Sequence, residues 1–227
     1  MTAGPIKIDL MIQARLGSTR LPGKALLPLG QDTTLGVMIE RVKRVKRARQ
    51  IVLLTTRLPE DEALVELAKE RGIQTYQGAT DDLLGRFYQA ALSYGTDVIV
   101  RLTGDCPFMD PAIIDEMLYL YTSNWPRIDF LTNCFQRTYA RGLDIEILSM
   151  AVLKRLHDQC HESYYREHVV PYLEEHPEEF AVVEYPNATD DSGYRLTLDT
   201  TEDYQTITNI YNFIYFTISL NRAWSLL

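Results

Sequence analysis

Three cations stand close together near the start of the chain. Arg15, Arg20 and Lys24 lie in the segment "QARLGSTRLPGK", among glycine and hydroxyl-bearing residues typical of a flexible loop. An apolar, strand-like run from residue 6 to residue 12 comes just before them. Loops that follow strands often carry function, and clustered cations neutralise phosphate groups. The segment therefore predicts a phosphate-binding loop, although any one of the three cations alone could be an ordinary exposed side chain.

Two carboxylates also follow predicted strands, much later in the chain. Asp105 stands in "LTGDCP" and Asp199 in "LDTTED". Asp105 also fits a simple turn before Pro107. Asp199 is not needed as a helix cap, because Thr200 and Asp203 have the spacing of a capping box.

These loops are expected to meet, because ligands of open α/β sheets bind beyond the carboxyl ends of the strands. Two carboxylates would then face three cations. Mg²⁺ commonly takes one or two protein carboxylates together with phosphate oxygens and water. The pattern predicts a site for a nucleoside triphosphate, with Asp105 and Asp199 as ligands of Mg²⁺.

Short apolar runs alternate with helical patterns over the first half of the chain. This alternation, with strands that are apolar on both faces, predicts an α/β fold with three layers, in which helices cover a mostly parallel sheet. Strands are expected at residues 6–12, 51–56, 73–78 and from 97, and helices at 34–47, 60–72, 81–95 and from 110.

The regular alternation ends at about Asp129. Strands are expected at residues 130–133 and 143–148, followed by two helices, and "YRLTLDTTEDY" predicts one more strand and a capped helix. We expect one domain over residues 1–227, with an irregular insertion at roughly 129–190.

Composition narrows the class of protein. A net charge of −8 argues against general nucleic-acid binding. The basic run "RVKRVKRAR" fits the solvated side of an amphipathic helix better than a phosphate-binding patch. Three widely spaced cysteines imply no disulfide framework and favour the cytoplasm. No signal peptide is recognisable, because the first apolar run is too short.

The apolar tail "YNFIYFTISL" is far shorter than the ~20 residues that span a bilayer. No membrane span is therefore expected. The tail predicts a packed terminal helix or strand at a subunit contact, and hence a homodimer.

Other ligand motifs are missing or weak. The glycines around Lys24 do not form a Walker loop, and the chain has no G-x-G-x-x-G fingerprint. His157 and His161 share a helical face in "HDQCH", but a structural zinc site needs four ligands, so a surface helix is favoured.

The first motif, "IQARLGSTRLPGKALLPLG", resembles that of cytidylyltransferases that activate acidic sugars. The chain is more similar still to the spore-coat polysaccharide cytidylyltransferases, through "GATDDLLGRFYQAA", "DVIVRLTGDCPFMDP", "YARGLDIEIL", "YREHVVPYL" and "RLTLDTTEDY" in that order. The resemblance extends to about residue 205 and implies a Rossmann-like nucleotide-diphospho-sugar transferase fold. It implies transfer of CMP from CTP to a sugar hydroxyl, with release of pyrophosphate.

The resemblance also implies roles for individual residues. Arg15, Lys24 and Asp105 would be catalytic, and the insertion would bind the sugar. The nucleotide-binding residues would be Ala14, Arg15, Arg20, Lys24, Thr80, Asp81, Asp82 and Arg86, and the sugar-binding residues Arg141, Asp144, Glu146, Arg166 and His168. An arginine would suit a sugar carboxylate. His168 fits a proton relay, although a structural histidine is the commoner case.

Two departures from the family pattern remove none of these residues. "TTED" stands where a proline usually follows Asp-Thr, and "YARG" lacks a proline before its arginine.

Three alternatives stay open. A glycosyltransferase would usually carry an Asp-x-Asp metal motif, whereas "GDCP" supplies one carboxylate. A sugar-1-phosphate nucleotidyltransferase would normally begin with a glycine-rich turn. A non-catalytic nucleotide-binding subunit would more readily lack Lys24 or Asp105.

Overall fold

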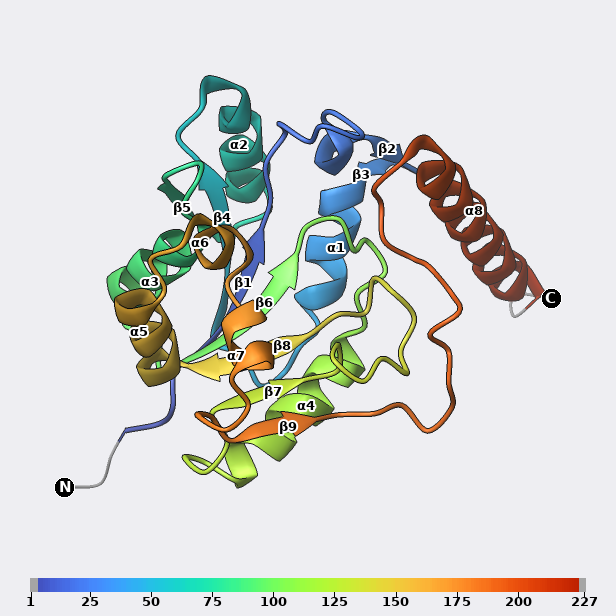
Figure 1. The fold of residues 1–227 in the computed structure, drawn as a ribbon. Coiled ribbons are helices and arrows are strands. Elements are labelled where there is room, and N and C mark those ends of the chain that lie inside the picture. Colours follow the sequence, from blue (N-terminus) through green and yellow to red (C-terminus); the bar gives the residue numbers. More distant parts are fainter. Residues whose placement is uncertain (1–3, 225–227) are drawn as a thin grey trace.

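A seven-stranded sheet forms the centre of the molecule (Figure 1). The computed structural model describes residues 4–224, with side chains as far as residue 217. The strands lie in the order β5-β4-β1-β6-β8-β7-β9. Their bounds are β1 Ile8–Gln13, β4 Gln50–Thr56, β5 Gln74–Gly78, β6 Val98–Thr103, β7 Phe130–Thr132, β8 Glu146–Ser149 and β9 Val182–Glu184. Only β8 is antiparallel to its neighbours in this sheet, so the predicted mostly parallel sheet is confirmed.

Helices cover both faces of the sheet because its central strands are apolar on both sides. In β1, Leu10 and Ile12 join one buried cluster and Met11 joins the other. The first face is covered by α1 (Thr34–Val42), α2 (Glu62–Glu70) and α4 (Pro111–Ser123). The second is covered by α3 (Leu83–Tyr94) and α5 (Met150–Gln159), with α6 (Ser163–His168) and α7 (Pro171–Glu175) beside them. This is the expected three-layer arrangement.

The helix predicted over residues 34–47 is too long. Helix α1 ends at Val42, and the backbone N–H groups of Lys46 and Arg47 each donate to Asp115 Oδ1 at 3.0 Å. Arg49 then binds the fully buried Asp9. The basic run is therefore mostly a turn tied to carboxylates of other elements, which periodicity alone does not reveal.

The strand predicted in "YRLTLD" is also wrong. Residues 194–199 make only an isolated bridge, between Arg141 and Arg195. The sheet position beside β7 is taken by β9, and the segment instead crosses between loops. Leu196 N donates to Arg141 O at 2.6 Å, and Leu198 N donates to Asp105 O at 2.8 Å. The strand predicted at residues 143–148 is shorter than expected, because β8 begins only at Glu146.

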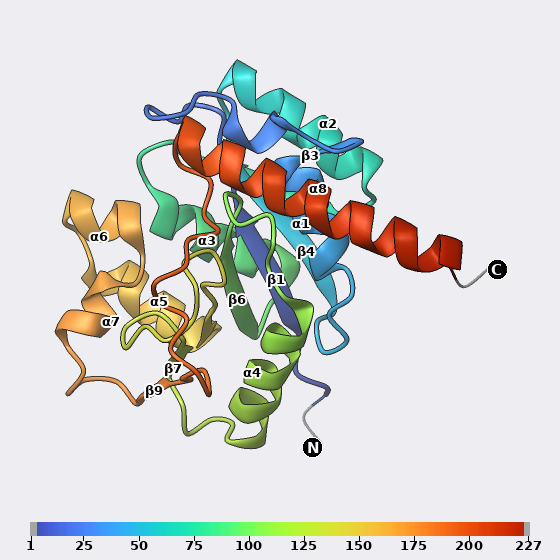
Figure 2. The same ribbon diagram turned by 90° about the vertical axis from the view of Figure 1, so that its right-hand side faces the viewer.

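The last helix, α8 (Thr201–Trp224), leaves the body of the molecule (Figure 2). Its first turns pack Ile207 and Tyr211 against Leu29, which stands in the small hairpin of β2 (Pro28–Leu29) and β3 (Asp32–Thr33). The tail at residues 211–220 is helical, which is one of the two predicted forms. Tyr211 packs on the hairpin, and the packing of the rest of the tail at a subunit contact stays a prediction. The exposed fractions of residues 213–216 run from 45% to 71%. The side chains of residues 218–220 lie outside the described part. Within residues 4–224 no helix is both long and apolar enough to cross a membrane.

Candidate active site

A cavity of about 420 Å³ opens beyond the carboxyl ends of β1 and β6. Small-molecule sites commonly measure about 300–1,000 Å³ and occur at this edge of α/β sheets. The lining residues are Gln13, Ala14, Arg15, Ser18, Thr19, Arg20, Lys24, Ala25, Thr80, Leu83, Arg86, Thr103, Gly104, Asp105, Glu167, His168 and Asp199.

Most residues singled out in the sequence meet in this cavity. Nine of them line it: Ala14, Arg15, Arg20, Lys24, Thr80, Arg86, Asp105, His168 and Asp199. Six do not: Asp81, Asp82, Arg141, Asp144, Glu146 and Arg166.

Lys24 is the centre of the charge network in the cavity. Its Nζ donates to Asp105 Oδ2 at 2.7 Å and to Asp199 Oδ1 at 2.9 Å, and Arg20 lies 2.8 Å from the same Asp199 oxygen. Burial lowers the pKa of Lys24, but the two carboxylates outweigh this effect and the pKa is raised. Burial raises the pKa of Asp199, but Lys24, Arg20 and Arg195 outweigh it and the pKa is lowered. Lys24 and Asp199 are therefore both charged at neutral pH.

Local backbone geometry brings the three loops together. Gly23, at φ +70°, precedes the short 3₁₀ helix η1 (Lys24–Leu26) and turns Lys24 toward the sheet edge. Gly104 N donates to Gln13 O at 2.8 Å, and a Cβ on Gly104 would lie only 3.0 Å from that oxygen. Only glycine therefore allows the Asp105 loop to pack this closely on the end of β1.

The segment that carries Asp199 leads into α8, and the start of that helix is held by a capping box, as predicted. Asp203 N donates to Thr200 Oγ1 at 3.2 Å, and Thr200 N donates to Asp203 Oδ2 at 3.1 Å. Arg195 joins the two carboxylates, lying 2.7 Å from Asp199 and 2.9 Å from Asp203. The Asp199 carboxylate is therefore not needed for the cap, and it pairs with Lys24, Arg20 and Arg195 instead.

The cationic loop is anchored by a residue that the sequence did not single out. Asp61 Oδ1 accepts from Leu16 N at 2.7 Å, and Thr56 Oγ1 donates to the other carboxylate oxygen. Asp61 is fully buried at the end of the 3₁₀ helix η2 (Pro59–Asp61). From the sequence it looks only like an acidic residue at a helix start.

The donor set at the centre of the cavity fits a hard divalent cation. Asp105 and Asp199 converge on one ammonium group, so their carboxylates can present oxygen ligands to a single positive centre. Asp105 and Asp199 are the residues that could hold it.

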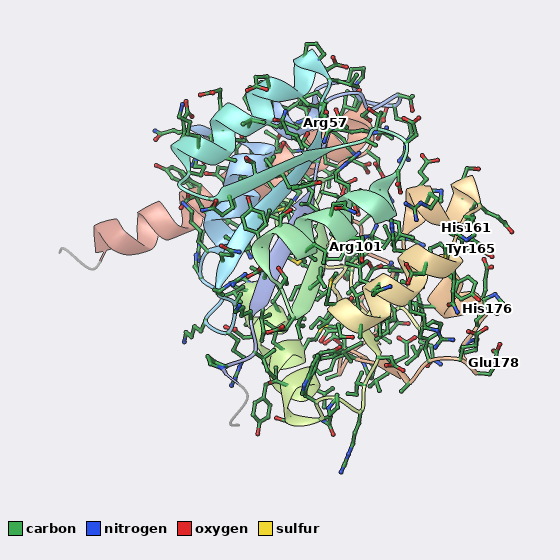
Figure 3. All side chains as sticks on the ribbon, turned by 90° about the vertical axis from the view of Figure 1, so that its left-hand side faces the viewer. Arg57, Arg101, His161, Tyr165, His176 and Glu178 are labelled. Carbon is green, nitrogen blue, oxygen red and sulfur yellow. The ribbon has the colours of Figure 1, made fainter. Side chains whose placement is uncertain are left out.

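Elsewhere in the described part of the chain, other clusters of potential metal ligands give weaker support for a metal site. His176, Glu178 and Glu179 are close together, and His176 and Glu178 stand at the outer edge of the molecule in Figure 3. His157, whose spacing from His161 allowed a zinc reading, instead stacks on Tyr88 at 4.2 Å, with its Nδ1 3.2 Å from Arg166.

Three of the residues expected to bind the nucleotide also make contacts within the protein or lie exposed. Arg86 is buried and donates to the carbonyl oxygens of Ala79 and Thr80, so it shapes the turn before α3. Burial and the nearby Arg15 lower the pKa of Arg86. Asp82 caps α3 by accepting from Gly85 N at 2.8 Å, and it pairs with Arg166. Asp81 is exposed. Their roles toward a nucleotide stay predictions.

Four of the five predicted sugar-binding residues lie outside the cavity lining. Asp144 pairs with Arg137 at 2.6 Å, and Glu146 pairs with Arg101, which lies beneath α3 in Figure 3. Arg166 is bound to Asp82, and Arg141 is exposed. His168 does line the cavity, beside Glu167, which the sequence did not single out. The sugar-binding roles stay predictions.

Comparison with known proteins gives a consistent family. The family model described as cytidylyltransferase matches residues 10–220. The spore coat polysaccharide biosynthesis protein SpsF of Bacillus subtilis is 33% identical over 211 residues, which cover 90% of this chain and 86% of that protein.

Solved structures give the same fold. The structure of a cytidylyltransferase from Leptospira borgpetersenii has a TM-score of 0.89 at 47% identity and covers 96% of each chain. That of CMP:2-keto-3-deoxy-manno-octonic acid synthetase complexed with CTP has a TM-score of 0.69 at 17% identity, and covers 90% of this chain and 98% of that one. At this identity the second likeness concerns the fold alone. The fold class expected from the sequence is confirmed.

Proposed function

Because the chain belongs to the cytidylyltransferase family, we propose that it transfers CMP from CTP to a hydroxyl group of a sugar. In this reaction the hydroxyl oxygen bonds to the α-phosphorus, and the bond from that phosphorus to the bridging oxygen breaks. Pyrophosphate leaves with the electron pair, and the hydroxyl proton passes to a base or to water. The observation that carries the proposal is the Lys24–Asp105–Asp199 network beside Arg15 and Arg20 in one cavity.

The cations of the first loop would bind the triphosphate. Arg15 and Arg20 reach the cavity from a mostly exposed loop, whereas Lys24 is half-buried and already fixed by two carboxylates. Fixed positive charge stabilises a developing phosphate charge without reorganisation, which is the main electrostatic means of lowering such a barrier. Lys24 is therefore the proposed residue at the α-phosphate.

Asp105 and Asp199 would hold Mg²⁺. When bound, the ion supplies positive charge that offsets the charge on the leaving pyrophosphate. The two carboxylates share the cavity with the proposed phosphates, and among the described residues Lys24, Arg20 and Arg195 are the cations that pair with them.

We propose a sugar as the acceptor because of what two relatives are named for. SpsF is named for spore coat polysaccharide biosynthesis, and a Geobacter sulfurreducens relative, 30% identical over 115 residues, is a 3-deoxy-manno-octulosonate cytidylyltransferase. These names support a sugar acceptor in surface-polysaccharide or nonulosonate-type metabolism, with acidic sugars among the candidates. We propose a cytoplasmic location for the enzyme, because CTP is available in the cytoplasm.

We test the reaction by measuring pyrophosphate release from each nucleoside triphosphate, with Mg²⁺ and a panel of acidic and neutral sugars. Release only with CTP and one class of sugar is expected. Asp105→Asn should abolish it, whereas Asp190→Asn, at an exposed residue outside the cavity, should not. Release with another triphosphate alone would overturn the nucleotide assignment, and a chain that binds no triphosphate would overturn the site.

We also propose a homodimer formed through α8. Residues 204–221 include no charged residue, whereas the whole chain has a net charge of −8. Two like-charged copies can approach most easily through such an uncharged surface, and Phe213 and Phe216 are 71% and 63% exposed on it. Light scattering should give a dimer for the wild type and a monomer for Phe213→Ser/Phe216→Ser. A monomeric wild type would contradict the proposal.

A further inference from the structure

Val169, directly after α6, has a strained backbone. Its φ is +71° and its ψ −56°, and it is the one non-glycine residue at positive φ within residues 4–224. Val170 N donates to His168 O at 2.9 Å, which closes a γ-turn around Val169. This turn is rare and unfavourable, above all for a β-branched residue. Such strain persists only where the surrounding structure enforces it, and it concentrates at functional sites.

Buried contacts enforce this turn from the C-terminal side. The Val169 side chain is fully buried and that of Val170 is 8% exposed, both in the cluster that also contains Leu173 of α7. Because these side chains occupy the core, the chain cannot relax the turn without withdrawing apolar groups from it.

Polar contacts hold α6 from the other side. Arg166 pairs with Asp82 at the start of α3 and donates to His157 O at 3.2 Å. The Tyr165 hydroxyl donates to Glu175 Oε2 at 2.6 Å, which ties α6 to α7. Figure 3 labels Tyr165. The end of α6 is therefore set by contacts with three other helices.

The position so fixed is that of Glu167 and His168. Both line the cavity that also holds Lys24, Asp105 and Asp199. Among the described residues of the segment 129–190, these two are the only ones in the cavity lining. The first loop lines the cavity with cations, whereas α6 adds a carboxylate and an imidazole. Helix α6 therefore supplies a second and chemically different part of the wall.

We propose that Glu167 recognises the acceptor sugar beside His168, for which the family resemblance already implies sugar binding, and that Val169 is the positioning residue that holds both in the cavity. The inference rests on the proposed transfer of CMP to a sugar. A carboxylate accepts hydrogen bonds from hydroxyl groups, and an imidazole can both donate and accept. The acceptor face that meets α6 thus carries hydroxyl groups rather than a carboxylate, which Glu167 would repel.

The first test separates the two substrates kinetically. Glu167→Gln should raise the KM for the acceptor at least tenfold and leave the calorimetric Kd for CTP within twofold of the wild type. Glu162→Gln, at an exposed residue of the same segment outside the cavity, is the matched control and should change neither. A tenfold weaker CTP affinity with an unchanged acceptor KM would overturn the assignment.

The second test addresses Val169. Val169→Gly permits the turn to relax and should raise the acceptor KM at least fivefold with little change in kcat, whereas Val169→Ile should retain the wild-type KM. Val170→Gly removes the same atoms from the same cluster without touching the strained position. If Val170→Gly raises the KM equally, the role of Val169 is packing and the positioning claim is wrong.

A third readout needs no turnover. The imidazole ¹⁵N–¹H signal of His168, assigned by its loss in His168→Gln, should stay unmoved by CTP alone and shift when a sugar of the panel is added to the CTP-bound protein. A wild type that binds CTP, but whose His168 signal responds to no sugar of the panel, overturns this inference. A wild type that binds no CTP overturns the proposed function instead.

Discussion

Lys24 and Asp199 are 175 positions apart in the chain, yet Lys24 Nζ donates to Asp199 Oδ1 at 2.9 Å. The bond joins the loop after the first strand to the segment just before the last helix, which begins at Thr201. Asp105, from the loop after β6, binds the same ammonium. One cation thus joins three of the segments that line the cavity, and its two partners there are residues proposed to carry the chemistry.

Lys24→Met is therefore expected to abolish turnover while the chain still folds. Loss of one preorganised charge that acts in the transition state costs about 10²–10³ in kcat. Lys69→Met is the matched control, because Lys69 is an exposed lysine of α2 outside the cavity. Steady-state kinetics with CTP and circular dichroism measure the two effects. Near-normal turnover by Lys24→Met would contradict the assigned mechanism.

Asp61→Ala should weaken both the fold and the binding of CTP. The substitution leaves the backbone N–H of Leu16 and the hydroxyl of the fully buried Thr56 without their partner. An unsatisfied buried polar group costs about 1–3 kcal/mol, and the loop that we propose to bind phosphate loses its anchor. Urea unfolding should show the lower stability, and kinetics a raised KM for CTP. Glu62→Gln, at the next position, should leave both unchanged; equal effects in the two variants would refute the anchoring role.

His157→Phe should change how stability depends on pH. Burial and then Arg166 lower the pKa of His157 from its ordinary 6.5. Above that pH the histidine is neutral in both the folded and the unfolded chain and contributes no pH dependence. As the pH falls below about 6.5, the unfolded chain takes up the proton first, so the wild type loses stability that the variant keeps.

Calorimetric Tm values from pH 7.5 to pH 5 measure this difference. Phenylalanine can keep the stacking on Tyr88, and the other three histidines are present in both proteins, so their effects largely cancel. Parallel Tm curves over the whole range would show that His157 is not perturbed by its surroundings.

Gly30→Ala should destabilise the attachment of α8. Gly30 has φ +67°, and a Cβ there would lie 2.4 Å from Tyr211 Cε1. Strain and overpacking together should cost about 1–3 kcal/mol of the free energy of unfolding. Gly193→Ala, which meets nothing within 4 Å, is the control. Tyr211→Ala added to Gly30→Ala should recover part of the loss; thermal unfolding that shows no recovery would place the strain elsewhere.

Much of the fold followed from the sequence, because the deciding interactions are local. Gly95, at φ +59°, follows α3 where the helical pattern stops, and Asp110 before Pro111 caps α4 as the pattern predicts. The Thr200–Asp203 box and the position of the cationic loop directly after β1 depend only on residue types a few positions apart. The motifs in their order also identified the family that the comparisons confirm.

The tertiary structure alone decided what depends on distant loops. Asp61 reaches Leu16 across 45 positions and Arg166 reaches Asp82 across 84, and no local spacing predicts either contact. For the same reason the sequence could not tell that α1 ends early at carboxylates of other elements, that residues 194–199 form no strand, or that Glu167 lines the cavity. Residue types determine which chemistry the chain can carry, whereas the packing of the sheet edge determines which of those side chains meet.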